Sequence, residues 1–190
     1  MKKFIFVLGG ARSGKSSYAV ELAKKLKKRT VFIATCISPD AEMKKRIKMH
    51  KALRPRQWKV IEEGKDINSV LIKLGNKPRP CAQRRGKYEI ILIDCLGMWL
   101  SNLLADGLAD KEIEKEISRL IKSISRCKGI VILVSNEVGT GIVPDNLPAR
   151  RFRDLVGFSN QMVAKEADRV IFMQSGIPMI IKGGRNAEIK

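Results

Sequence analysis

The sequence predicts an α/β fold of the P-loop nucleotide-binding class, in which a mostly parallel sheet carries helices on both faces and an antiparallel strand at one edge. Short apolar runs alternate with amphipathic helical patterns along the chain. The runs are almost continuously apolar, which is typical of strands that are covered on both faces. A glycine-rich phosphate-binding motif follows the first run and precedes the first helical pattern.

The first predicted strand covers residues 4–8 and follows two lysines, so it briefly imitates a signal peptide. The apolar run is short, and Arg12 and Lys15 follow at once, so a buried strand is the better interpretation. The same criteria predict strands at 30–35, 89–94, 130–135 and 169–174. Residues 175–182 are predicted to form a turn and a last strand, antiparallel at the edge of the sheet.

Amphipathic helices are predicted between the strands, at 19–26, 41–50, 67–74, 111–126 and 149–166. Asp66 and Asp110 are candidate N-caps, because a side-chain oxygen just before a helix can accept a hydrogen bond from its first turn. Gly129 lies just past the end of the fourth helix, where glycine is common.

Length and composition indicate how many domains the chain forms and which classes of protein it can belong to. With 190 residues and 44% hydrophobic residues, the sequence predicts a single domain over 1–190 with a mobile tail at 183–190, and it excludes disorder and a membrane span. The net charge of +19 favours anionic partners. The four cysteines form no CxxC pair and there is one histidine, so a Cys/His zinc site is excluded and reduced thiols in a cytoplasmic protein are expected.

The motif GGARSGKS matches the phosphate-binding pattern G-x-x-x-x-G-K-[ST] in its required context. Glycines let the backbone wrap closely around phosphates, and the following helix presents its positive end to them. Lys15 is predicted to neutralise the β- and γ-phosphates, and Ser16 to bind Mg²⁺. The alternative is a glycine-rich turn that binds nothing. The nucleotide-binding residues predicted here are Gly9, Gly10, Ala11, Arg12, Ser13, Gly14, Lys15 and Ser16.

Three further residues lie at the ends of predicted strands or directly after them. Asp94 is the candidate acidic partner of the motif and would hold the metal or its water shell; it could instead be a polar strand end or an N-cap. Asn136 and Glu137 follow the strand at 130–135, and ligands of open α/β sheets bind at the carboxyl ends of strands, so they are candidate substrate residues. A loop that only packs is the alternative for this pair.

His50 is the only histidine and lies on one face of a helical pattern with Met43 and Ile47. One interpretation is a histidine that packs inward. The other is a nucleophile, because Arg46 and other cations nearby lower the pKa of the imidazole and stabilise a phosphate under attack. Pro55 ends this helical pattern.

Five segments occur in an order that resembles the bifunctional adenosylcobinamide kinase/adenosylcobinamide-phosphate guanylyltransferase family of cobalamin biosynthesis. They are GGARSGKS, IATCISPDAEMKKRIKMHKALRP, IDCLGMWLSNLL, SNEVGTGIVPDNLPARRFRDLVGFSNQMVAKEAD and SGIPMIIK. The phrase NEVGTGIVP, followed by RRFRDLVGFSNQ, is much more specific than the phosphate motif. The resemblance extends from the first strand to about Lys182.

The resemblance implies two reactions on one chain: phosphorylation of adenosylcobinamide by a nucleoside triphosphate, then transfer of GMP from GTP through a histidine to give adenosylcobinamide-GDP. ATP and GTP are the implied nucleotides, and a homotrimer is the implied assembly. His50 in RIKMHKALRP matches the family histidine. Matching also assigns nucleotide binding to Ala34, Thr35, Cys36, Lys51, Ala52, Leu53, Arg54 and Glu62, and the metal-side acid to Asp94.

The chain departs from the family pattern at Ser135 and Gly97, where members often have threonine. The first difference keeps a hydroxyl, and the second removes one near the kinase site. The basic loop at 77–87 is longer than expected, and its charge indicates solvation. Two other functions remain open from sequence: a P-loop kinase of another small alcohol, and a nucleic-acid-binding ATPase. The second is poorly supported because aromatic residues make up only 5%.

Overall fold

The computed structural model describes residues 3–36, 51, 54–75 and 88–184. They contain a seven-stranded sheet in the order β3-β2-β4-β5-β1-β6-β7. The strands are β1 Lys3–Gly9, β2 Thr30–Ala34, β3 Lys59–Glu62, β4 Ile90–Asp94, β5 Ile130–Asn136, β6 Arg169–Gln174 and β7 Ile177–Lys182. Neighbouring strands are parallel, except that β7 runs antiparallel to β6 at the edge. The predicted fold class and antiparallel edge strand are confirmed.

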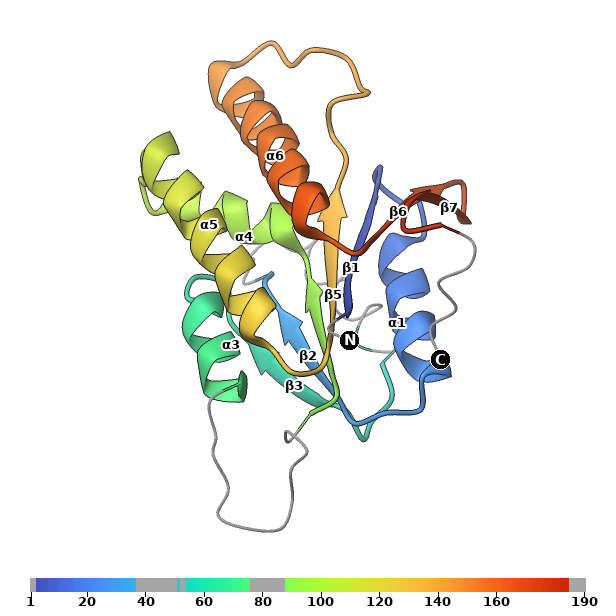
Figure 1. The fold of residues 1–190 in the computed structure, drawn as a ribbon. Coiled ribbons are helices and arrows are strands. Elements are labelled where there is room, and N and C mark those ends of the chain that lie inside the picture. Colours follow the sequence, from blue (N-terminus) through green and yellow to red (C-terminus); the bar gives the residue numbers. More distant parts are fainter. Residues whose placement is uncertain (1–2, 37–50, 52–53, 76–87, 185–190) are drawn as a thin grey trace.

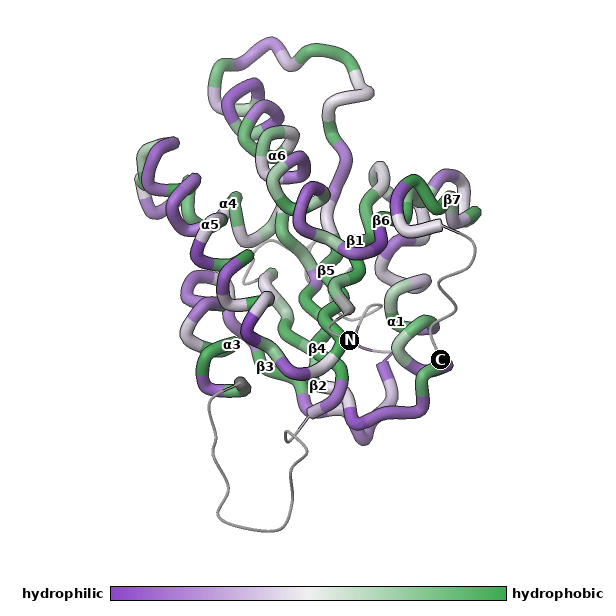
Figure 2. The backbone as a smooth tube through the Cα atoms, in the orientation of Figure 1, coloured by the Kyte–Doolittle hydropathy of each residue, from purple (hydrophilic) through white to green (hydrophobic). Residues whose placement is uncertain are grey.

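Helices cover both faces of the sheet (Figure 1). The described helices are α1 Lys15–Lys25, α3 Ile67–Gly75, α4 Leu96–Ala105, α5 Asp110–Arg126 and α6 Leu147–Glu166. α1 lies on one face, and α3 to α6 lie on the other. Along β1 the side chains alternate between these layers: Phe4 and Phe6 belong to the core under α3 to α6, and Ile5 and Val7 to the core under α1. Figure 2 shows mostly hydrophobic residues along the central strands, whereas hydrophilic and hydrophobic residues mix along the helices.

The helix boundaries test the two predicted caps. Asp66 accepts a hydrogen bond from the Ser69 backbone N–H at 3.1 Å, so its assignment as the cap of α3 is confirmed. The assignment of Asp110 is wrong. α5 begins at Asp110 itself, with Ala109 as N-cap, and the Asp110 carboxylate accepts a hydrogen bond from Arg151 Nε of α6 at 2.7 Å. A charged partner on the neighbouring helix therefore takes the oxygen that a cap would have used.

Two elements were not predicted. β3 has only four residues, most of them exposed, so it lacks the apolar run of a central strand. α4 is apolar on nearly all sides, because Leu96, Trp99, Leu100 and Leu103 are buried, and it shows no polar face in the sequence. The predicted helix at 41–50, the basic loop at 77–87 and the tail beyond residue 184 lie outside the described residues.

Two further features concern membrane-spanning helices and the cysteines. Within the described ranges, no helix is long and apolar enough to cross a bilayer. Cys95 and Cys127 are buried and Cys36 is half-buried, in agreement with the prediction of mostly buried cysteines.

Candidate functional site

The phosphate motif forms the connection between β1 and α1, at the carboxyl edge of the parallel strands (Figure 1). Gly14 has a φ of 87° and is the N-cap of α1, a left-handed conformation that glycine adopts at no steric cost. The turn of β6 and β7 supports the loop, because the Gly176 N–H donates to the Ser13 carbonyl at 3.1 Å. The backbone N–H groups at the start of α1 can bind an anion, because the first N–H groups of a helix have no partner within it.

Gly9 opens the motif and packs too closely for any side chain. A Cβ placed there would lie 2.5 Å from the Met173 carbonyl oxygen and 2.6 Å from Ser13 Oγ. A Cβ on Gly10 would meet no heavy atom within 4 Å. The beginning of the loop is therefore fixed by contact with β6, and the next residue has space beside it. Ser13 Oγ is buried and has no hydrogen-bond partner among the described residues, so it can donate to a ligand.

Lys15 is largely withdrawn from solvent beside the loop. Its Nζ donates to the Gly10 carbonyl at 3.1 Å, and burial lowers the pKa of its ammonium group. Burial also raises the pKa of the neighbouring Cys95 thiol to about 12. The thiol is therefore uncharged at neutral pH, and Asp94 is the anion whose charge opposes the shift of the Lys15 pKa. A partly desolvated ammonium group favours a phosphate as partner.

Ser16 and Asp94 come together from different strand ends. Ser16 lies in the first turn of α1, and its Oγ donates to Asp94 Oδ1, at the end of β4, at 3.2 Å. A hydroxyl and a carboxylate beside a phosphate loop are the oxygen ligands that Mg²⁺ uses when it keeps several waters and bridges phosphates. The residues present therefore fit the predicted magnesium site. No cluster of three His, Cys, Asp or Glu side chains occurs in the described part, and such a magnesium site needs none.

The end of β2 is tied to the end of β4. Thr35 is fully buried, and its hydroxyl donates to the Cys95 carbonyl and accepts from the Cys95 N–H, both at 2.7 Å. The hydroxyl of Thr35 is thus occupied within the protein. Ala34 lies beside Asp94 in the parallel register, and Cys36 is half-buried. The predicted residues of this segment consequently lie next to the phosphate motif.

Two side chains of α4 support this region, and the sequence interpretation missed them. Asn102 Nδ2 donates to the carbonyls of Thr35 at 2.8 Å and of Gly64 at 2.9 Å. Trp99 Nε1 donates to the Lys65 carbonyl at 2.7 Å. The two side chains therefore join the segments that follow β2 and β3. A polar asparagine inside the apolar run WLSNLL was the available signal for this role.

Arg54 is a half-buried cation, and part of its guanidinium group has no hydrogen-bond partner among the described residues. Its Cζ lies 3.7 Å from the centroid of the Phe32 ring. Among the described residues, the buried Nε and Nη1 atoms have no hydrogen-bond partner. Burial lowers the pKa of Arg54, and the charges of Asp94 and Glu62 act in the opposite direction. A guanidinium with unused donors, close to the carboxylate of the phosphate site, is suited to bind an anion.

Glu62 and Lys51 form an ion pair at the end of β3. Lys51 Nζ lies 2.8 Å from Glu62 Oε1, and the hydrogen bond and charge of Lys51 lower the pKa of the Glu62 carboxyl. Both side chains are more than half exposed, so the pair contributes little to stability. His50 lies outside the described residues, as do Ala52 and Leu53.

Asn136 and Glu137 lie beside the phosphate motif, where their position after a strand led us to expect them. The Glu137 N–H donates to the Gly9 carbonyl at 2.9 Å, and Glu137 Oε1 accepts from the Gly139 N–H at 2.6 Å. The Asn136 amide faces Gly97, since a Cβ there would lie 3.4 Å from Asn136 Nδ2. A side chain at position 97 would therefore contact a candidate substrate residue.

Comparison with known proteins adds an independent result. The family model for cobinamide kinase / cobinamide phosphate guanyltransferase matches residues 5–181. The bifunctional adenosylcobalamin biosynthesis protein CobP of Pseudomonas aeruginosa is 37% identical over 179 residues, covering 93% of this chain and 96% of that protein. The corresponding protein CobU of Salmonella typhimurium is 39% identical over 190 residues, covering 94% of this chain and 99% of that protein.

A solved structure supports the fold alone. An ATPase from a bacterial type III secretion system aligns with a TM-score of 0.52 at 13% identity, over 90% of this chain and 50% of that one. The fold, the phosphate loop and the near full-length matches agree. The chain belongs to the cobinamide kinase / cobinamide phosphate guanyltransferase family.

Proposed function

We propose that the protein phosphorylates adenosylcobinamide with a nucleoside triphosphate and then transfers GMP from GTP, through a GMP-histidine at His50, to give adenosylcobinamide-GDP. The observation that carries this proposal is the position of Arg54. Its partly unpartnered guanidinium is close enough to both Asp94 and Glu62 for their charges to affect its pKa. Arg54 belongs to the segment that follows His50 and lies near the carboxylate of the phosphate site, so its cation can serve nucleotide chemistry at both.

In the first reaction, the substrate hydroxyl oxygen attacks the γ-phosphorus, the bond to the bridging oxygen breaks, and the nucleoside diphosphate leaves as the hydroxyl loses its proton. The loop of residues 9–16 would hold the triphosphate, and Lys15 would neutralise its β- and γ-phosphates. Ser16 and Asp94 would hold Mg²⁺, which supplies positive charge to the phosphates when bound. Asn136 and Glu137 would contact the substrate alcohol, and the bond from the Glu137 N–H to the Gly9 carbonyl supports this assignment.

In the second reaction, a neutral imidazole nitrogen of His50 attacks the α-phosphorus of GTP, and pyrophosphate leaves. A phosphate oxygen of adenosylcobinamide phosphate then attacks the same phosphorus, and the phosphorus–nitrogen bond breaks. Arg54 and Lys51 supply cations for the phosphate charge, and the Lys51–Glu62 pair orients the chain directly after His50. Ala34, Thr35, Cys36, Ala52 and Leu53 complete the proposed nucleotide site.

The first reaction is tested by incubating the protein with adenosylcobinamide, Mg²⁺ and γ-labelled ATP or GTP, then separating the corrinoid products. We expect the label in adenosylcobinamide phosphate, and its dependence on the nucleotide shows which triphosphate the kinase step prefers. Without GTP the product should remain the phosphate, and with GTP it should become adenosylcobinamide-GDP. Hydrolysis of the nucleotide that leaves no label in any corrinoid product would contradict the proposal.

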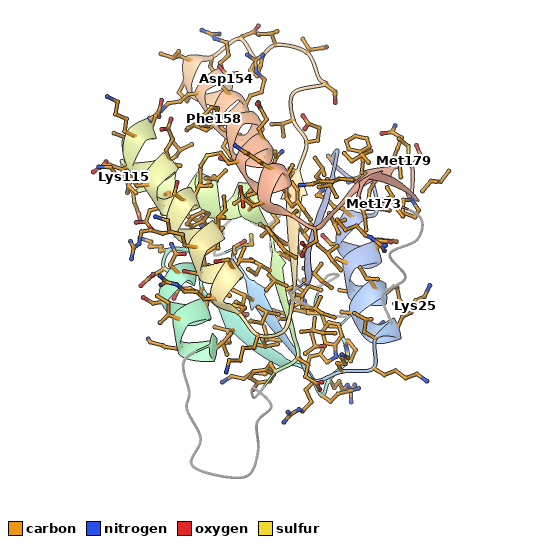
Figure 3. The ribbon with its side chains drawn as sticks, viewed as in Figure 1. Lys25, Lys115, Asp154, Phe158, Met173 and Met179 are labelled. Atoms are coloured by element: carbon orange, nitrogen blue, oxygen red, sulfur yellow. The ribbon has the colours of Figure 1, made fainter. Side chains whose placement is uncertain are left out.

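We also propose a homotrimer in the cytoplasm. The edge strand β7 carries exposed apolar side chains, among them Ile177 at 64% and Ile181 at 60% exposure, which are suited to contact another subunit. Met179 lies on the same strand (Figure 3). The free thiols of Cys36 and Cys95 agree with a reducing compartment.

A further inference from the structure

A pair of buried hydrogen bonds connects helix α6 to the end of β5. Asn160 is 5% exposed and Ser135 is fully buried. Ser135 Oγ donates to Asn160 Oδ1 at 2.7 Å, and Asn160 Nδ2 donates to the Asn136 carbonyl oxygen at 2.9 Å. Because Oδ1 already accepts from the serine hydroxyl, the side-chain amide is fixed with its NH₂ group toward the backbone.

The peptide group that accepts from Asn160 also contacts the phosphate motif. The Asn136 carbonyl and the Glu137 N–H belong to one planar peptide unit. On its other side this unit donates from Glu137 N to the Gly9 carbonyl at 2.9 Å. Gly9 in turn packs against the Met173 backbone so closely that a Cβ would not fit. One peptide plane is therefore held between Asn160 and the first residue of the phosphate loop.

We infer that Asn160 is a positioning residue for phosphoryl transfer, an inference that rests on the kinase function proposed above. Both polar atoms of its side chain form hydrogen bonds within the protein. It acts through the peptide unit of residues 136 and 137, which sets the position of the Gly9 carbonyl and the direction of Asn136 and Glu137. Small errors in the position of reacting groups cost large factors in rate, so loss of this contact should reduce turnover.

The decisive variant is Asn160→Asp, which keeps the size and the acceptor for Ser135 but places a carboxylate oxygen against the Asn136 carbonyl. We expect kcat for adenosylcobinamide phosphorylation to fall by at least about tenfold. The Kd of a non-hydrolysable triphosphate should rise by at least about fivefold, because the phosphate loop is displaced.

The matched control is Asn68→Asp. Asn68 is 1% exposed and donates to Glu116 Oε2 of α5 at 2.9 Å, so the same change creates the same kind of buried conflict away from the phosphate loop. This variant should lose thermal stability yet keep kcat and the triphosphate Kd within about twofold of wild type. Ser159→Ala is a second control, since Ser159 is buried next to Asn160 but its hydroxyl donates to the Leu155 carbonyl of its own helix.

Ser135 supplies a milder variant in case Asn160→Asp does not fold. Ser135→Ala frees the Asn160 amide to rotate and should lower kcat by about threefold or more. Ser135→Thr keeps the hydroxyl and should therefore keep kcat at the wild-type value. The inference is overturned if folded Asn160→Asp matches Asn68→Asp in kcat and triphosphate Kd, or if Ser135→Ala retains wild-type kcat. If the wild type bound triphosphate but did not phosphorylate adenosylcobinamide, the proposed function would fail, and the Kd comparison would still decide the role of Asn160.

Discussion

Lys15 and Arg54 are two cations whose surroundings leave part of their charge uncompensated. Burial lowers the pKa of both side chains, and Arg54 has buried donors without partners among the described residues. Desolvation of a cation is unfavourable in the empty protein, but it is common where the cation binds a ligand, because desolvated charges bind anions more strongly. These two residues therefore mark the anion-binding part of the proposed site.

Lys15→Met separates catalysis from stability. A lysine whose pKa is lower in the folded state carries a penalty that is fully present below the folded pKa and is relieved as pH rises toward the unfolded pKa. At neutral pH the variant removes this penalty, so Tm without nucleotide should equal or exceed that of wild type. Kinase kcat should fall by about a hundredfold or more.

Thermal melts without nucleotide and labelled-product assays on the same preparations measure both effects. A variant that melted several degrees lower would show that the ammonium group stabilises the empty fold. Kinase turnover at the wild-type rate would show that the ammonium group is dispensable for phosphoryl transfer.

At the scale of elements, the connection between β1 and α1 depends on one close contact. In Gly9→Ala the new methyl group would meet the Met173 carbonyl and Ser13 Oγ, so the phosphate loop or β6 must shift. We expect a loss of roughly 1–3 kcal/mol in the free energy of unfolding, typical of overpacking. Gly10→Ala is the matched comparison, because its methyl group meets no atom within 4 Å.

Denaturant unfolding of both glycine variants measures this difference. Equal stabilities, or a larger loss in Gly10→Ala, would contradict the packing described for the beginning of the loop.

Elements with a regular apolar pattern could be predicted from sequence, and those without one could not. The central strands and α5 show clear patterns. β3 is short and exposed, and α4 is buried on nearly every side, so neither has the periodicity that prediction relies on. Asp110 fails as a cap because Arg151, distant in sequence, binds its carboxylate.

The candidate site was predictable to the extent that local motifs describe it. The pattern at 9–16 indicates a phosphate loop, and the acid after a strand indicates Asp94, which the structure places within hydrogen-bonding distance of Ser16. The contact of Arg54 with Phe32 and the bonds of Asn102 and Asn160 join residues far apart in the chain. Neither the periodicity nor the spacing of residues indicates such contacts, so they could not be predicted from the sequence.

At the scale of the whole molecule, β7 carries exposed apolar side chains that are suited to self-association. Ile177 and Ile181 both lie on this strand and are more than half exposed. Ile177→Lys with Ile181→Lys should convert the proposed trimer to smaller species in sedimentation velocity. Ile72→Lys, at a 40% exposed position on α3, introduces the same chemical change elsewhere and should leave assembly unchanged.

A wild-type protein that sediments as a monomer at working concentrations would contradict the proposed trimer. Double-lysine variants that still formed trimers would exclude β7 as the contact surface.

The net charge of +19 concerns the whole surface and leaves the choice of partner open. The family match and the phosphate site favour small phosphorylated ligands over a nucleic acid. The covalent step proposed at His50 is what would distinguish the proposed function from that of a simple kinase.

The most direct measurement is incubation with α-labelled GTP and Mg²⁺, followed by denaturing electrophoresis of wild type, His50→Asn and Lys15→Met. We predict that wild type retains the label, that γ-label leaves with pyrophosphate, and that the bond is labile to acid and comparatively stable to base. His50→Asn should carry no label yet still phosphorylate adenosylcobinamide, because the phosphate loop does not need the imidazole. Covalent GMP on His50→Asn, or no label on wild type under conditions where it forms adenosylcobinamide-GDP, would contradict the account.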